Sequence, residues 1–524
     1  MGVVRRVQGL FIMKATLTGS GWSDRMPTPL WEALVRHVAA RPVPWHVPGH
    51  KMGRGAPPDL IRWLGAGLKL DLTELPGLDD LHQPEGPIAE AQVLVAQTFG
   101  ADESFFLVGG STVGNIAMLL ATCEPGETVL IARNVHRSVI SGLMLAGASA
   151  LVVAPDWEYD LGVPGGIRVE TVARILGAHP EIRTVLVTSP TYHGVCSDLA
   201  SLAEEVHRRG GLLLVDEAHG GHFPFVQGSP PGALASGADA VVQSWHKTMG
   251  SLTQSAVLHL RGNRVDRQRI RESLAMVQSS SPSYLLMVSL DLARQWMQDE
   301  GGRRLDSVVQ TLAQVREELD AVPGVDVLTA ERARRAGGVG LDPARLTLGV
   351  VGSRGTGIEW GEALRRRGIW PELEEPTAVT FVAGPGDDSR IIGRLVKGLQ
   401  DVAMEIGGVG EPAEGRRGSR VFPGTEAAEW AALLQELWHN EEGQDLIRPR
   451  LARKVRWVPL GKALGLQAAR AVIPYPPGIP MLLPGERIRP LHNELIRMGR
   501  SMGVRLVGMP SDEEVVAVTE EGRE

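Results

Sequence analysis

The length, charge and cysteine content of the chain set the first limits on what it can be. With 524 residues it is too long for a single hydrophobic core, and roughly two to four domains are expected. Its 54 basic and 61 acidic residues give a net charge of −7, which argues against nucleic acid as the main partner. The two cysteines, Cys123 and Cys196, offer no disulfide framework and fit a reducing cytoplasm. No apolar stretch reaches the ~20 residues of a membrane-spanning helix, so no membrane partner is expected.

The first part of the chain, residues 1–50, is expected to form a leader followed by a helix. Residues 1–14 contain two arginines and a brief apolar patch, but this patch is too short for the core of a signal peptide. Either Met13 or Met26 could be the true first residue. Residues 28–40 have apolar side chains at helical spacing and a proline near their start, which predicts a helix there.

Residues 51–300 are expected to form a large domain. Short apolar runs alternate with helical segments in this part: TVLIARN, ALVVAP, RTVLVTSP, GLLLVDEAH and ADAVVQSWHK. Such alternation predicts an α/β fold, with a mainly parallel sheet and helices on both of its faces. Each run ends in polar residues, and in a parallel sheet these ends can share one site.

A glycine-rich turn is the first candidate binding element. The apolar residues 105–108 lead into residues 109–112, which open a helical pattern. Backbone N–H groups and the helix dipole favour an anion at such a turn, so Gly110, Ser111 and Thr112 are candidate phosphate ligands. An ordinary helix N-cap is the alternative. A nicotinamide-binding fingerprint does not fit, because G-x-G-x-x-G is not spelled here.

Asp216 follows the apolar run of residues 212–215, at the end of a predicted strand. A carboxylate at this place can keep the ring nitrogen of pyridoxal phosphate protonated, so that the ring withdraws electrons from the substrate carbon. A single Asp is otherwise often a turn or cap residue. The letters DEAH also occur in helicases, but the G-x-x-x-x-G-K-[ST] loop of a nucleotide-hydrolysing motor is not spelled in this sequence. His219 and His222 have no third ligand at a recognisable spacing, so no metal is expected.

Lys247 stands directly after another apolar run, residues 238–243, within SWHKT. A lysine at a strand end ordinarily keeps its ammonium group in solvent. The alternative is a Schiff-base lysine, whose buried amine loses its proton and attacks an aldehyde. Asp216 precedes Lys247 by 31 residues, enough for one helix-sized connection between neighbouring strands. The two residues together favour a site for pyridoxal phosphate.

The order of the motifs indicates a family. The motifs are PGHKMG, LTELPGLDDLHQPEGPI, GGSTVGN, NVHRSV, SPTYHGVCSDL, DEAHGGHF, SWHKT, SSSPSYLLMVSLD and PYPPGIPMLLPGE. This set resembles the Orn/Lys/Arg decarboxylase family, which consists of pyridoxal-phosphate enzymes with the aspartate-aminotransferase fold (fold type I). The resemblance runs from about residue 48 to about residue 486 and is specific for the family, but not for a substrate.

The resemblance implies roles for single residues. It places His136 on one face of the cofactor ring, Ala218 on the opposite face and His219 near the ring hydroxyl. The phosphate ligands it implies are Gly110, Ser111, Thr112, Ser244 and His246. It also implies a homodimer or higher homo-oligomer, in which the N-terminal part packs on the partner subunit and Ser281 and Ser283 reach that subunit's site. For His136, the alternative is an ordinary cap or core histidine. For Ser281 and Ser283, it is a serine-rich loop with a helix N-cap.

The remaining segments complete the predicted organisation. Residues 301–406 are expected to form a smaller α+β domain, residues 407–424 a linker, and residues 425–524 a C-terminal α+β module. By its position in the family pattern, Glu372 is a candidate to bind the distal cation of a basic substrate, although a solvated acid is the alternative.

The predicted function is decarboxylation of a basic L-amino acid to a polyamine precursor. Arginine, giving agmatine, is favoured over lysine or ornithine. In this prediction Lys247 forms the Schiff base and Asp216 stabilises the quinonoid intermediate. An aminotransferase on the same fold is the main alternative and needs an arginine clamp such as Arg345, Arg354 or Arg390. A non-catalytic protein on this fold and a metal hydrolase are more remote alternatives.

Overall fold

A computed structural model describes residues 26–322, 324–351, 353, 355–406, 425–439, 445–452, 454–475 and 478–520. The predicted leader of residues 1–14, the predicted linker of residues 407–424 and Arg354 lie outside the described residues. The helix predicted for residues 28–40 is α2 (Pro29–Ala39), which has Pro29 in its first turn. In the described part of the chain, no helix is both long enough and apolar enough to cross a membrane.

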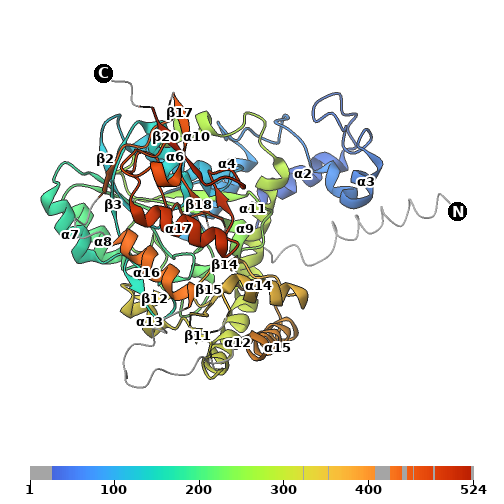
Figure 1. Cartoon of the computed structure of the whole chain (residues 1–524). Coiled ribbons are helices and arrows are strands. Elements are labelled where there is room, and N and C mark those ends of the chain that lie inside the picture. The colour runs from blue at the N-terminus through green and yellow to red at the C-terminus, as the bar shows by residue number, and fades with distance from the viewer. Residues whose placement is uncertain are drawn as a thin grey trace.

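The centre of the molecule is an eight-stranded sheet with the order β1-β10-β9-β8-β6-β2-β3-β16 (Figure 1). In that order the strands are Glu103–Leu107, Ala256–Leu260, Ala240–Gln243, Leu212–Asp216, Thr184–Thr188, Thr128–Ala132, Ser149–Val153 and Asp445–Ile447. The strands from β9 to β3 are parallel, whereas β1, β10 and β16 pair antiparallel at the two edges. The prediction of a mainly parallel α/β sheet is confirmed.

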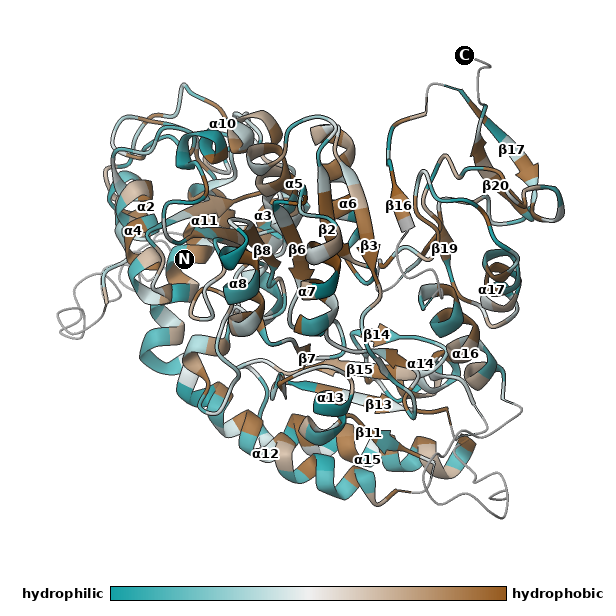
Figure 2. Ribbon diagram, turned by 90° about the vertical axis from the view of Figure 1, so that its left-hand side faces the viewer, coloured by the Kyte–Doolittle hydropathy of each residue, from teal (hydrophilic) through white to brown (hydrophobic). Residues whose placement is uncertain are grey.

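Helices cover both faces of this sheet, and the side chains of β1 show why. Successive strand residues point to opposite faces. Phe105 and Leu107 pack in one buried cluster with helices α5 (Gly110–Thr122), α6 (Arg137–Ala146) and α8 (Leu199–Arg208). Phe106, between them, packs in a second cluster with α4 (Pro87–Phe99) and α11 (Tyr284–Trp296). Figure 2 shows the central strands β8, β6, β2 and β3 mainly as brown, apolar ribbons with helices around them.

A second, antiparallel sheet follows in the chain, with the order β11-β13-β15-β14. Its strands are Asp326–Val327, Arg345–Gly349, Ala378–Val382 and Leu373–Glu374. Helices α12 (Gly302–Asp320), α14 (Gly357–Arg366) and α15 (Ser389–Ile406) share its apolar cluster. Figure 2 shows α12 and α15 beneath this sheet. Strands β11, β13 and β15 correspond to the sequence runs GVDVLTA, RLTLGVV and AVTFVAGPGD.

The C-terminal part forms a third apolar cluster. It contains helices α16 (Glu426–Trp438) and α17 (Pro490–Ser501) and two strand pairs, β17–β20 (Val455–Pro459 with Val515–Thr519) and β18–β19 (Ile473–Pro474 with Leu506–Val507). Strand β16 lies after the predicted linker but pairs with β3 at the edge of the central sheet. The C-terminal residues therefore extend the large sheet in addition to building their own layer.

Candidate active site

The carboxyl ends of three neighbouring parallel strands bring the candidate residues together. In the register of the sheet, Thr188 of β6 lies beside Asp216 of β8, and Asp216 lies beside Val242 of β9. Just beyond these ends, Ser244 N donates a hydrogen bond to Ala218 O over 3.3 Å. Parallel strands place their ligands at this edge.

Asp216 is buried, and both of its carboxylate oxygens accept a hydrogen bond. Asn115 Nδ2, from α5, donates to Oδ2 over 2.7 Å, and the backbone N–H of Ala218 donates to Oδ1 over 3.1 Å. Asn115 Nδ2 also lies 3.0 Å from Ser138 Oγ, which is 2.8 Å from His136 Nδ1. Donors on both oxygens stabilise an ionised carboxylate. A fixed negative charge therefore lies at the end of β8.

Lys247 lies in the single-turn helix α9 (Trp245–Thr248), and its Nζ is 2.9 Å from Nε2 of His219. Burial lowers the pKa of Lys247 from 10.5 to about 8, although Asp216 acts in the opposite direction. An amine with such a pKa is partly neutral, and thus nucleophilic, near neutral pH. The adjacent Trp245 is fully buried and stacks on Phe99 with ring centroids 5.2 Å apart, as expected for core packing.

His136 caps the N-terminus of α6, where its Nδ1 accepts a hydrogen bond from the backbone N–H of Ser138 over 3.2 Å. Burial lowers the pKa of His136 to about 4, and Lys247 lowers it further while Asp216 opposes the change. The imidazole is therefore neutral near pH 7. A Cβ atom added at Gly478 would lie 3.5 Å from His136 Nε2, so the C-terminal part closes over this ring.

Two of the predicted phosphate ligands, Gly110 and His246, contact the same loop at residues 254–255. Gly110, which has a φ of +72° at the start of α5, donates its backbone N–H to Gln254 O over 2.8 Å. His246 Nδ1 lies 2.8 Å from Ser255 O, the next carbonyl along the chain. Ser244 Oγ is buried and has no hydrogen-bond partner. A buried hydroxyl without a partner is costly, so this one is available to bind a ligand.

Other predicted residues lie further out. In the first turn of α5, Ser111 is half-buried and Thr112 is exposed. Ser281 is exposed and Ser283 occupies the N-cap of α11, so their cross-subunit role stays a prediction. Glu372 is exposed, but its charge acts on Lys247.

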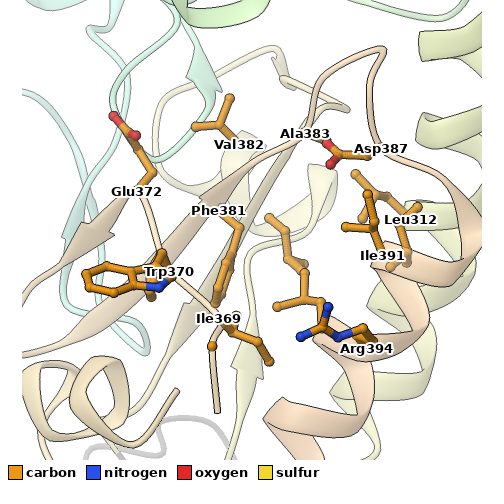
Figure 3. Close-up of a pocket in the computed structure, with 15 residues that line it drawn as sticks. Leu312, Ile369, Trp370, Glu372, Phe381, Val382, Ala383, Asp387, Ile391 and Arg394 are labelled. Atoms are coloured by element: carbon orange, nitrogen blue, oxygen red, sulfur yellow. The ribbon is translucent and has the colours of Figure 1, made fainter. Parts of the chain in front are cut away.

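Glu372 also lies at the rim of a pocket of about 320 Å³. Figure 3 shows its carboxylate turned away from the aromatic side chains of Trp370 and Phe381. The lining of this pocket includes neither Lys247 nor Asp216. The pocket is therefore separate from the group of residues around Lys247.

Sequence reasoning missed three residues or gave them other roles. Asn115 stands four positions after Ser111, on the same helix face, which is a usable signal. Tyr192 follows the strand motif RTVLVTSP, and its ring lies 5.6 Å from Lys247 Nζ. Arg345, considered above only as an aminotransferase clamp, is buried and donates from Nη2 to His219 Nδ1 over 2.7 Å. Arg390, the other clamp candidate within the described residues, is exposed on α15.

The two histidines weighed as metal ligands have other partners. His219 contacts Lys247 and Arg345, and His222 Nε2 lies 2.9 Å from Asp342 Oδ1. Throughout the described ranges, no group of three or more His, Cys, Asp or Glu side chains is arranged to hold a metal ion.

Comparison with known proteins shows which family the chain is similar to. Residues 28–335 match the family model of the Orn/Lys/Arg decarboxylase major domain, and residues 440–521 match that of the C-terminal domain. The chain is 35% identical to an arginine decarboxylase of Bacillus subtilis over 88% of its length and 91% of that protein. It is 33% identical to an arginine decarboxylase of Halalkalibacterium halodurans, over 94% of its length and 97% of that protein. The structure of lysine decarboxylase A from Pseudomonas aeruginosa superposes with a TM-score of 0.76 at 22% identity, covering 94% of this chain and 80% of that one.

The α/β fold, with buried charged groups at the strand ends, and these relatives define an amino-acid decarboxylase. The chain belongs to the Orn/Lys/Arg decarboxylase family. Its relatives support a basic amino acid as substrate.

Proposed function

We propose that the protein decarboxylates L-arginine to agmatine with pyridoxal phosphate bound at Lys247. The observation that carries this proposal is the arrangement at the strand ends, where a buried carboxylate, a lysine of lowered pKa and a neutral histidine act on one another electrostatically. Arginine is chosen over lysine and ornithine because the relatives that cover nearly the whole chain at 33–35% identity carry that substrate in their names.

The residues present fit the cofactor. Ser244 Oγ, buried without a partner, and the turn at the N-terminus of α5 would hold the phosphate together with His246. Asp216 would hold the ring nitrogen, and Lys247 would hold the aldehyde carbon through its amine. His136 and Ala218 would contact the two ring faces. When bound, pyridoxal phosphate supplies an electron sink for the pair left on the substrate carbon as carbon dioxide departs.

The chain's own residues supply charge and protons. The ionised Asp216 is fixed in place by Asn115 and Ala218 N, so it needs no reorganisation as charge develops in the reaction. Lys247 Nζ, with a pKa of about 8, can both hold and release a proton near neutral pH. His136 stays neutral and can pack against an aromatic ring without adding a positive charge.

Glu372 is the proposed partner for the distal cation of the substrate. It is exposed, and its charge acts on Lys247, Arg345, Tyr192 and His246, which supports a role beside the site. A carboxylate can accept two parallel hydrogen bonds from a guanidinium group, which suits arginine better than an ammonium group.

The proposal includes a homodimer. Helix α3 (Pro58–Leu64) has no buried residue, and the side chains of Trp45 and Trp63 are 91% and 84% exposed. Figure 1 shows α3 at the periphery of the molecule. An apolar surface of this kind is typical of an interface, and a second copy of the chain is the proposed partner. The free, buried Cys123 and Cys196 suit the proposed location in the cytoplasm.

The test uses the purified full chain with pyridoxal phosphate and offers arginine, lysine and ornithine separately. Agmatine and carbon dioxide from arginine, with much slower release from the other two, are expected. Reduction with borohydride followed by peptide mass mapping should find the cofactor on Lys247, and Lys247→Ala should lose both activity and label. Formation of a keto acid without carbon dioxide would instead identify an aminotransferase.

A further inference from the structure

Three polar side chains from separate parts of the chain, those of Arg345, His219 and Lys247, form a continuous series of contacts. Arg345, the first residue of β13, places Nη2 2.7 Å from Nδ1 of His219. On the other side of the same ring, Nε2 of His219 lies 2.9 Å from Nζ of Lys247. Arg345 and His219 are 1% and 2% exposed, so water does not compete for these contacts. The ring of His219 therefore connects a buried guanidinium to the reactive amine.

The hydrogen-bonding capacities of the three groups allow one arrangement of protons. A guanidinium group has only donors and keeps its charge in proteins. Nδ1 of His219 must therefore accept, so it carries no proton. A neutral imidazole then has its proton on Nε2, which donates toward Lys247. An ammonium group has no lone pair to receive this proton, so the partner must be the neutral amine.

We propose that Arg345 is a positioning residue that fixes the Nε2–H tautomer of His219 and thereby holds Lys247 as the free amine. This inference rests on the proposed role of Lys247, because the free amine is the form that attacks an aldehyde. Arg345 acts through His219 in this proposal. It is not assigned to the substrate carboxylate.

The surroundings support the assignment. A doubly protonated His219 would point an N–H at the guanidinium, and burial together with Lys247 and Arg345 lowers the pKa of His219 well below its ordinary value. The Tyr192 ring packs against His219 with centroids 4.7 Å apart. Asp342 Oδ2 lies 3.9 Å from Arg345 Nε, and Asp342 Oδ1 lies 2.9 Å from His222 Nε2. Asp342 therefore holds a carboxylate close to the guanidinium.

The charges that face Lys247 work in both directions. Burial and Arg345 favour the neutral amine, whereas Asp216 and Glu372 favour the ammonium form. The nearby His136 and His246 have lowered pKa values and add no charge near pH 7. With a pKa of about 8, roughly a quarter of the Lys247 amines are neutral at pH 7.5, against about one in a thousand for an ordinary lysine. A hydrogen bond donated to the neutral form acts in the same sense.

The first experiment measures the protonation of Lys247 in the full chain after removal of the cofactor. Competitive acetylation across a pH series, read by mass spectrometry of the Lys247 peptide, gives the midpoint of its reactivity. The wild-type midpoint is expected near pH 8. Arg345→Met should raise it by at least about one pH unit, which is a tenfold loss of neutral amine at a given pH. Arg345→Lys, which keeps a donor and a charge, should recover part of the change.

A double-mutant cycle separates the tautomer from the simple loss of charge. In His219→Gln, the side chain has no tautomers, so Arg345→Met can act on Lys247 only through space. The shift caused by Arg345→Met should then be much smaller than in the wild-type background. Equal shifts in the two backgrounds would overturn the proposal. Arg294→Met removes another buried guanidinium, which pairs with Asp291 and is not among the charges that act on Lys247, so it is the matched control and should leave the midpoint unchanged.

The second experiment needs no change at Arg345. In protein labelled with ¹⁵N-histidine, the His219 signals are identified by their absence from His219→Gln. A protonated Nε2 and an unprotonated Nδ1 are expected across neutral pH. The opposite tautomer or an imidazolium would refute the proposal. If borohydride trapping instead placed the cofactor on another lysine, the proposed function would fail while the tautomer result stood unchanged.

Discussion

Two buried arginines, one just after a strand of the central sheet and one at the start of a strand of the second sheet, have different roles. Arg133, just after β2, donates from Nη1 to Pro480 O over 2.8 Å and from Nη2 to Met481 O over 2.7 Å, and it pairs with Glu486 at 3.3 Å. Arg345, at the start of β13, has one short hydrogen bond, to His219, and its Nε and Nη1 have no hydrogen-bond partner. Both side chains are almost completely removed from solvent.

The difference separates a structural junction from a reactive site. Around Arg133, charge and carbonyl partners join the central sheet to the C-terminal part. Burial raises the pKa of Glu486, but Arg133, His492 and the backbone N–H of Leu483 together lower it to about 2. Around Arg345, donors remain unused and neighbouring pKa values of Lys247 and His219 are lowered. Incomplete pairing has a cost, and such sites are often the functional ones.

The largest expected effect on stability is at the junction. Arg133→Met removes the fully buried cation that pairs with the Glu486 carboxylate and leaves it Arg489 and His492, so the free energy of unfolding should fall by about 3 kcal/mol, measured by urea denaturation. The double variant Arg133→Met/Glu486→Gln should recover part of this loss. Arg345→Met should cost less, because Asp342 keeps its partner His222. An equal loss in the two single variants would remove the proposed distinction between the arginines.

The pH dependence of the junction gives the next largest effect. The folded pKa of Glu486 is about 2, below the ordinary 4.5. A lowered carboxyl pKa contributes stability that is fully present above the ordinary value and is lost as the pH falls toward the folded value. The difference in unfolding free energy between wild type and Glu486→Gln should therefore shrink by on the order of 3 kcal/mol from about pH 5 toward pH 2. A difference that stays constant over this range would contradict the assignment.

At the reactive site the effect should appear in rate instead of stability. Asp216→Asn keeps the size of the side chain but removes the charge, so kcat is expected to fall on the order of a hundredfold, as for other groups that stabilise developing charge. The melting temperature should change little, because the new amide oxygen can accept from Ala218 N and its NH2 can donate to the unpartnered Oδ1 of Asn115 after the Asn115 amide turns over. Steady-state kinetics and thermal unfolding of the same preparation check both parts. A large loss of stability with unchanged kcat would place Asp216 in the structural class with Arg133.

The features of the reactive site and those of the structural junction also differ in how well the sequence predicts them. Asp216 and Lys247 stand directly after apolar runs, and the carboxyl ends of parallel strands meet by geometry, so local pattern was enough to predict their region. The mainly parallel sheet was predictable for the same reason, since its apolar runs are long and regular. Asn115 was within reach, because a helix repeats its face after four residues.

Contacts between distant segments were not within reach. Nothing in the sequence RLTLGVV indicates that Arg345 meets His219, because that contact depends on how the second sheet docks against the first. The pairing of β16 with β3 was equally hidden, since three residues at a sheet edge have no recognisable period. The partners of Arg133 at Pro480 and Met481 are set by a proline-rich path that has no regular pattern.

The smallest expected effect concerns substrate choice at the exposed edge of the site. Glu372→Gln removes one carboxylate that is open to water, and an exposed ion pair is worth up to about 1 kcal/mol, so KM for arginine should rise roughly fivefold while kcat changes little. Glu374→Gln is the matched control. Glu374 pairs with Arg365 on α14, so this substitution is expected to leave KM unchanged.

The comparison of substrates makes this prediction sharper. If Glu372 binds the guanidinium group through two hydrogen bonds, arginine should lose more affinity than lysine in Glu372→Gln, because an ammonium group makes a single point contact. KM measured for arginine and lysine in both variants separates a direct contact with the guanidinium group from a general effect of the Glu372 charge. The general effect would raise KM for the two substrates equally. A rise in KM confined to Glu374→Gln would instead place the recognition of the distal group on the side of the second sheet where Arg365 lies, and Glu372 would then be a solvated acid.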